Sequence, residues 1–256
     1  MKTYIVGNWK MNFAVGESSV YLHKLQQKIH AYRDVEVVVA PSLTALQPLS
    51  LQVDRRKLRL AAQTANPHDF GAYTGEVSFT QLRGLVDYCL IGHSERRYLF
   101  HQDDKDIRSA VAAALRNQIT PILCIGETET EHTFNETGDV LRDQLLGGLS
   151  EVSKEDLSKV LIAYEPVWAI STTTDAHLAS PEEIGDTITF IRTLLRKTYG
   201  ADIADQAAVL YGGSVNPTNA GAYLTVPGVN GLLIGGASLI ADQFLEIIET
   251  AKKVRD

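Results

Sequence analysis

Four polar side chains interrupt apolar runs where they could act together in proton transfer: Asn8, Lys10, His93 and Glu165. A carboxylate among apolar neighbours is a stronger base than a solvated one. An imidazole beside the start of a helix is kept neutral by the partial positive charge there, yet it still donates an N–H. Alternation along a strand puts Asn8 and Lys10 on one face, where an amide and an ammonium could stabilise an oxyanion. This set predicts proton abstraction next to a carbonyl group.

Each of these residues also has an ordinary structural interpretation. Lys10 could extend into solvent at the end of its strand, and His93 could be a satisfied core histidine. Glu165 could turn outward to a salt bridge. For any one segment these alternatives stay open, so the chemical interpretation depends on the side chains meeting in one place.

Two glycine-rich turns could bind an anion. They are Gly212-Gly213-Ser214 and Gly235-Gly236-Ala237-Ser238, and each follows an apolar run. Backbone N–H groups at such turns form a concave site for phosphate, although a pair of glycines is more often only a tight turn. Together with the polar residues above, they predict a small phosphorylated substrate.

Eight short apolar runs recur along the chain with helical patterns between them, which predicts the elements that position these residues. Continuous rather than alternating apolar runs are typical of parallel strands that are covered on both faces. The runs are Tyr4–Trp9, Val35–Ala40, Leu58–Ala62, Tyr88–Gly92, Pro121–Gly126, Val160–Tyr164, Ala208–Tyr211 and Gly231–Ile234.

With no linker or change of composition, the pattern predicts one (β/α)8 barrel domain over residues 1–256. The second choice is an open doubly wound sheet, which is less favoured because no glycine-rich dinucleotide motif follows the first strand of either half. Helix starts support the alternation. Ser180-Pro181-Glu182-Glu183 is a capping box that opens a helix ending near Gly200, and Asn216-Pro217 opens another.

Catalytic groups of such barrels lie at the carboxyl ends of the strands, and alternation predicts which side chains face inward. His93 should share its face with Cys89 and Ile91, and Glu165 should share its face with Ala163. Both are therefore expected to point into the mouth of the barrel.

The net charge is −7 and the pI is near 5.5, so neither nucleic acid nor an anionic membrane is an expected partner. Cys89 and Cys124 lie in apolar runs and are expected to be buried free thiols in a reducing compartment. Without an apparent signal peptide or bilayer-length apolar run, the protein is expected to be cytoplasmic. No metal-ligand cluster or nucleotide motif is apparent, so no metal or cofactor is expected.

Five motifs together resemble the triosephosphate isomerase family: GNWKMN (7–12), GHSERR (92–97), AYEPVWAI (163–170), YGGSVNP (211–217) and GGASL (235–239). The resemblance covers essentially the whole chain. It implies interconversion of dihydroxyacetone phosphate and glyceraldehyde 3-phosphate in glycolysis and gluconeogenesis, with no cofactor. A glutamate base acting beside a neutral histidine is the arrangement already known for this family.

The resemblance also assigns roles to individual positions. Catalytic and substrate-binding roles fall on Asn8, Lys10, His93 and Glu165. Phosphate-binding amides fall on Ser171, Ser214, Gly235 and Gly236. Supporting and lid positions are Glu95 near the lysine, Glu127 as partner of Trp168, Ile170 and Leu233 as the apolar pair over the glutamate, and Pro166 and Tyr211.

Members of the family are mostly homodimers, so the resemblance implies a homodimer here. The segment Gln63–Glu76 would be the finger that docks into the other subunit, with Thr74 close to the partner's Asn8. A solvated surface loop is the alternative for this segment, and its residues alone do not decide between the two.

The lid departs from the family pattern. Where the family has Gly-Thr-Gly-Lys, this chain has Ser171-Thr172-Thr173-Thr174 and a few extra residues before Pro181. A β-branched Thr173 would be strained if the closed lid needs a positive φ there. Slower closure or poorer protection of the intermediate is therefore expected, measurable as phosphate loss. The alternatives are a lid-impaired barrel that binds sugar phosphate with little or no isomerase activity, and a phosphate-binding barrel for a larger substrate.

Overall fold

The chain forms a closed barrel of eight parallel strands. It is seen here in a computed structural model that describes residues 2–170 and 178–254. Each strand pairs with the next in chain order, and β8 returns to β1. The predicted (β/α)8 barrel is confirmed, and the open sheet is wrong. The strands are β1 (Thr3–Asn8), β2 (Val35–Ala40), β3 (Arg59–Ala62), β4 (Tyr88–Ile91), β5 (Thr120–Ile125), β6 (Leu161–Tyr164), β7 (Ala208–Tyr211) and β8 (Gly231–Ile234).

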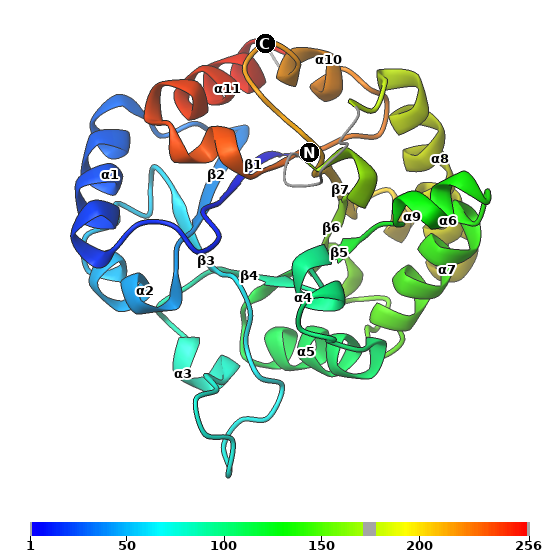
Figure 1. Cartoon of the computed structure of the whole chain (residues 1–256), viewed down its shortest axis with the longest axis horizontal. Coiled ribbons are helices and arrows are strands. Elements are labelled where there is room, and N and C mark those ends of the chain that lie inside the picture. Colours follow the sequence, from blue (N-terminus) through cyan, green and yellow to red (C-terminus); the bar gives the residue numbers. More distant parts are fainter. Residues whose placement is uncertain (1, 171–177, 255–256) are drawn as a thin grey trace.

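Helices form a ring around the barrel (Figure 1). The α-helices are α1 (Val15–Lys28), α2 (Leu43–Ser50), α3 (Phe79–Leu82), α4 (Ser94–Tyr98), α5 (Asp104–Arg116), α6 (Glu129–Thr133), α7 (Thr137–Gly148), α8 (Pro181–Tyr199), α9 (Ala201–Ala204), α10 (Ala220–Leu224) and α11 (Ala241–Lys253). The 3₁₀ turns are η1 (Leu157–Lys159), η2 (Val167–Ala169) and η3 (Gly236–Leu239). In the part of the chain that the structure describes, none of the helices has the length and apolarity needed to span a bilayer.

The two helix starts expected from the sequence have different outcomes. The capping box at α8 is confirmed, because Ser180 and Glu183 exchange side-chain and backbone hydrogen bonds, and Gly200 ends the helix at φ 92°. The helix expected to open at Asn216-Pro217 is present but begins later, since α10 starts at Ala220 after a turn whose last N–H donates to the Asn216 carbonyl. The Asn216 side chain accepts hydrogen bonds from the following backbone N–H groups, which holds a turn there instead.

Apolar side chains fill two layers, one inside the barrel and one between the strands and the helices. The strands are therefore covered on both faces, which explains their continuous apolar sequences. The buried interior set is Val6, Val38, Ala40, Ala61, Leu90, Ile122, Cys124, Leu161, Ala163, Ala208, Leu210 and Leu233.

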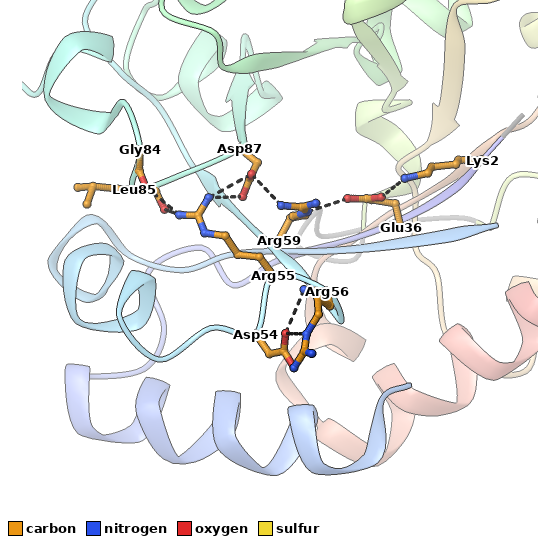
Figure 2. Close-up of polar contacts among 9 residues, drawn as sticks. All are labelled: Lys2, Glu36, Asp54, Arg55, Arg56, Arg59, Gly84, Leu85 and Asp87. Atoms are coloured by element: carbon orange, nitrogen blue, oxygen red, sulfur yellow. Dashed lines mark hydrogen bonds and ion pairs between the residues drawn. The ribbon is translucent and has the colours of Figure 1, made fainter. Parts of the chain in front are cut away.

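Ion pairs link residues near the starts of β1 to β4, at the amino-terminal end of the barrel (Figure 2). Lys2 and Arg59 both contact Glu36, at 2.6 and 3.2 Å, and Arg59 also contacts Asp87 at 3.3 Å. Arg55 contacts Asp87 at 3.2 Å and donates to the carbonyl of Gly84. These charges satisfy one another, which is consistent with a stabilising role at the end opposite the expected catalytic groups.

Candidate active site

Three of the predicted catalytic residues lie together at the carboxyl-terminal end of the barrel. Asn8 is the last residue of β1, His93 follows β4, and Glu165 comes directly after β6. Their exposed fractions are only 5%, 5% and 3%. Polar side chains buried this deeply need hydrogen-bond partners, so their contacts describe the site.

His93 and Glu165 contact each other directly. The His93 Nε2 atom lies 3.3 Å from the Glu165 Oε1 atom. On the other side of the ring, Nδ1 accepts a hydrogen bond from the backbone N–H of Glu95 at 3.2 Å. Because Nδ1 is an acceptor, the ring hydrogen is on Nε2 and the imidazole is neutral. A carboxylate base and an uncharged N–H donor therefore lie side by side, and Glu165 does not turn outward to a surface salt bridge.

The prediction that His93 shares a strand face with Cys89 and Ile91 is wrong, although His93 does reach the mouth of the barrel. Cys89 and Ile91 pack outward toward the helices, whereas Leu90 lies in the barrel interior. Gly92 has φ 71°, a left-handed conformation that breaks the alternation of the strand. A Cβ at Gly92 would lie 3.0 Å from the Arg97 side chain and 3.3 Å from a backbone oxygen, so the turn has little room for another residue.

Alternation holds on β6, where Ala163 faces the interior as predicted and Glu165 follows on the same side. The Glu165 N–H donates to the carbonyl of Ile125 at 2.8 Å, which fixes the backbone of the base to the neighbouring strand. Cys124 is a buried free thiol, as is Cys89. Burial, and then the nearby Glu165 carboxylate, raise the pKa of the Cys124 thiol well above its usual value, so it stays neutral.

Lys10 is held by Glu95 rather than extending freely into solvent. Its Nζ atom lies 2.7 Å from Glu95 Oε1, and the side chain is 19% exposed. The Lys10 backbone has φ 53°, an uncommon value for a residue with a side chain. Its N–H donates to the Asn8 side-chain oxygen at 3.0 Å, so Asn8 shapes this turn.

A cavity of about 180 Å³ opens beside these groups. Its walls include Asn8, Lys10, His93 and Glu95. Glu165 is not one of the lining residues, because its carboxylate is turned to His93. The cavity can take a small polar molecule, but the base must move to reach it.

Gln63 also lines this cavity, and sequence reasoning assigned it no role in the site. Its side-chain amide donates to the carbonyl of Lys10 at 2.8 Å and to the carbonyl of Ala40 at 2.9 Å. It therefore helps to hold Lys10 in its left-handed conformation. Nothing in the local sequence indicates this contact, because it joins residues that are 53 positions apart.

The glycine turns after β7 and β8 border the same site. A Cβ at Gly212 would lie 2.7 Å from Glu165 Cγ, and one at Gly235 would lie 3.6 Å from Lys10 Cε. Gly236 begins η3. The Ser214 N–H donates to the carbonyl of Ala169 at 2.9 Å, so in this conformation it is already engaged and would have to exchange partners to bind an anion.

The predicted contact between Glu127 and Trp168 is present. The indole Nε1 donates to Glu127 Oε1 at 2.8 Å, and the Tyr164 hydroxyl donates to the same oxygen at 3.1 Å. Burial, and then Glu127, raise the pKa of Tyr164 well above its usual value, so the phenol remains a donor. Glu127 itself is fully buried and anchors the turn that follows the base.

The remaining supporting residues that are described lie on the turn after Glu165 or in β7 and β8. Pro166 follows the base and its carbonyl accepts from the N–H of Ala169. Ile170 is 8% exposed at the end of η2. Leu233 is buried in the barrel interior, and a Cβ at Gly212 would lie 3.4 Å from its Cβ. Tyr211 lies beneath Gly213, where an added Cβ would meet its hydroxyl at 2.0 Å.

The lid substitutions fall outside the described residues. Ser171, with its predicted phosphate-binding amide, and the rest of the run through Thr174 belong to residues 171–177. The expectation of altered lid behaviour therefore stays a prediction.

The segment Gln63–Glu76 extends away from the barrel between β3 and α3 (Figure 1). Phe70 is 90% exposed and Tyr73 is 43% exposed, although Tyr73 stacks on His68 with ring centroids 4.6 Å apart. Exposed aromatic side chains on a projecting loop are typical of a surface that contacts another protein.

Comparison with known proteins gives a consistent result. The model of the family described as Triosephosphate isomerase matches residues 3–251. Proteins named Triosephosphate isomerase from Flavobacterium johnsoniae and Alkaliphilus oremlandii are each 40% identical over 248 residues, covering 96% of this chain and 98% of the relative. The protein of that name from Chlamydia trachomatis serovar L2 is 40% identical over 250 residues, covering 97% of this chain and 89% of the relative.

Proposed function

Because the chain belongs to the triosephosphate isomerase family, we propose that it interconverts dihydroxyacetone phosphate and D-glyceraldehyde 3-phosphate. The reaction moves a proton between adjacent carbons through an enediolate, as a step of glycolysis and gluconeogenesis. The observation that carries the proposal is the contact between the neutral His93 Nε2–H and the Glu165 carboxylate beside the Lys10 cavity. A base and an uncharged electrophile are what this chemistry requires.

The roles follow from the contacts. Glu165 removes the proton from the carbon next to the carbonyl and returns it to the neighbouring carbon. His93 donates its Nε2 hydrogen to the substrate oxygen, and Asn8 assists from the end of β1. Lys10 supplies positive charge, and Glu95, at 2.7 Å, keeps that charge directed toward the cavity.

The substrate must change one contact of the free site. Glu165 now accepts from the same His93 atom that would bind the substrate oxygen. When the substrate oxygen accepts the hydrogen bond from His93 Nε2, the Glu165 carboxylate loses His93 as its partner. It is then free to enter the cavity. The backbone amides of Ser214, Gly235 and Gly236, together with the amide of Ser171, would hold the phosphate.

The reaction gains and loses neither electrons nor atoms, so the proposal includes no cofactor and no metal. Since the substrates are soluble metabolites of central metabolism, we place the protein in the cytoplasm, with no nucleic-acid or membrane partner. We propose that residues 1–256 form one domain.

We also propose a homodimer through the finger Gln63–Glu76. The exposed Phe70 and Tyr73 of the finger, and Met11, 97% exposed beside Lys10, support it. Thr74 would lie near the partner's Asn8. Light scattering coupled to size-exclusion chromatography tests this, and a monomer mass at micromolar concentration would contradict it.

A coupled assay with both triose phosphates tests the function on the purified protein. We expect rapid turnover in both directions, at least a hundredfold loss for Glu165→Gln, and no change for Glu155→Gln, an exposed glutamate on another face. The same assay, read together with inorganic phosphate release, separates an isomerase from a barrel that only binds sugar phosphate. Binding of substrate without turnover would overturn the proposal.

A further inference from the structure

His132, in the short helix α6, lies against the turn that follows the base. Its ring stacks on the Trp168 indole, with centroids 4.5 Å apart and planes 26° from parallel. Its Nδ1 atom lies 3.6 Å from Glu127 Oε1, the oxygen that accepts the indole hydrogen. The imidazole is 43% exposed, whereas Glu127 is fully buried. A solvent-accessible titratable ring therefore touches both members of a buried hydrogen bond.

The hydrogen bond from Trp168 to Glu127 fixes the backbone turn that follows Glu165 in the chain. Trp168 belongs to η2, three residues after the base, and the N–H of Val167 donates to the carbonyl of Glu127 at 2.9 Å. Glu127 thus holds the turn through its side chain and its backbone. Pro166 alone separates Glu165 from this turn, so a backbone movement that carries Glu165 toward the cavity would also involve the turn.

His132 lines a cavity together with several other described residues, and every charged side chain among them is a carboxylate. This cavity, of about 190 Å³, is lined by Glu127 from the end of β5 and by Glu183 and Asp186 from α8. Helix α6 itself carries Glu129 and Glu131. The neighbouring Trp168, Tyr164, Thr137 and Thr187 are uncharged, Tyr164 because its pKa is far above the physiological range.

A proton on His132 would therefore strengthen the anchor in two ways. The imidazolium would be attracted to the Glu127 carboxylate and to Glu183. It would also place a cation over the face of the Trp168 indole. Both effects stabilise the arrangement seen here, in which the turn is held and Glu165 is turned to His93.

We propose that His132 is a positioning residue that makes the release of Trp168, and with it the approach of Glu165 to the substrate, dependent on pH. The neutral ring leaves the turn free to shift, and the imidazolium retains it. The effect on rate rests on the proposed isomerase function, whereas the effect on the indole does not.

The kinetic test compares the wild type with His132→Asn, which is always neutral, and His132→Arg, which is always charged. Turnover number is measured from pH 5.5 to 9, and each rate is divided by the rate of His132→Asn at the same pH, which removes the titration of the substrate and of the base. We expect the wild-type ratio to be near 1 at pH 9 and to fall about threefold by pH 5.5. The His132→Arg ratio should be low at every pH. His23→Asn, an exposed histidine on α1, is the control and should follow the wild type.

A second readout needs no substrate. The chain has two tryptophans, so its indole N–H resonances are two, and Trp168→Phe assigns the one from Trp168. We expect the Trp168 resonance to shift with pH in the wild type and to lose that pH dependence in His132→Asn. Ratios that do not change with pH, or an indole titration that survives in His132→Asn, would overturn the inference. Failure of the proposed function is separate, since it would abolish turnover and leave the indole titration intact.

Discussion

Replacing Gly212 by alanine should displace the side chain of the base, Glu165. Gly212 follows β7, and a Cβ there would lie 2.7 Å from Glu165 Cγ and 3.4 Å from Leu233 Cβ. The φ of Gly212 is not in the left-handed region, so the effect is steric rather than conformational. The added methyl group and the base cannot both keep their places.

The required displacement can be worked from these distances. Raising the contact from 2.7 Å to an ordinary 3.4 Å needs a shift of about 0.7 Å. Movement of the carboxylate is limited on the other side by His93, whose Nε2 is already 3.3 Å from Oε1. Since a misplacement of about 1 Å can cost about a hundredfold in rate, we expect Gly212→Ala to lower kcat by about tenfold to a hundredfold. The crowding should also cost about 1–3 kcal/mol of stability.

Steady-state kinetics in the coupled assay and urea unfolding measure the two effects. The KM should change little, because the added methyl group meets the Glu165 side chain rather than the groups that line the cavity. Gly147→Ala, in helix α7 with open space around the added methyl group, is the matched control. It should keep kcat and gain up to about 1 kcal/mol of stability. A kcat for Gly212→Ala within twofold of the wild type would refute the reasoning.

Three further predictions use the same assays. Glu165→Asp withdraws the carboxylate by one methylene and should lower kcat by about a hundredfold or more with little change in KM; an unaltered rate would remove Glu165 from the mechanism. Arg59→Leu loses contacts to two carboxylates at the amino-terminal end (Figure 2), and should cost about 1 kcal/mol in urea unfolding while kcat stays unchanged. Burial and the hydrogen bond to Glu249 raise the pKa of Tyr32 to about 12. The folded state therefore favours the protonated phenol, and this stabilisation is complete below about pH 10 and lost as the pH rises through about 12. The stability difference between the wild type and Tyr32→Phe should accordingly shrink between pH 8 and pH 12; a constant difference would contradict it.

Sequence patterns predicted the barrel because the strands are buried on both faces and therefore stand out as continuous apolar runs. Val35–Ala40 matches its strand at both ends. The local rules failed where one residue changes the backbone path, as Gly92 does when it turns His93 inward although Cys89 and Ile91 face outward. They also gave no role to Gln63, because its contact to Lys10 depends on the closed barrel bringing the two together.

The catalytic groups of the free protein are paired with one another, except that Glu165 Oε2 has no hydrogen-bond partner among the described residues. His93 is satisfied by Glu165, and Lys10 by Glu95. Leaving any of them without a partner in this interior would be costly. A substrate that supplies a carbonyl oxygen to His93 replaces Glu165 as its acceptor, so binding itself releases the base. The carboxylate can then be satisfied by accepting the proton of the adjacent carbon, which is the step that the proposed reaction requires. Binding and proton transfer are thus linked through a single shared atom, the His93 Nε2.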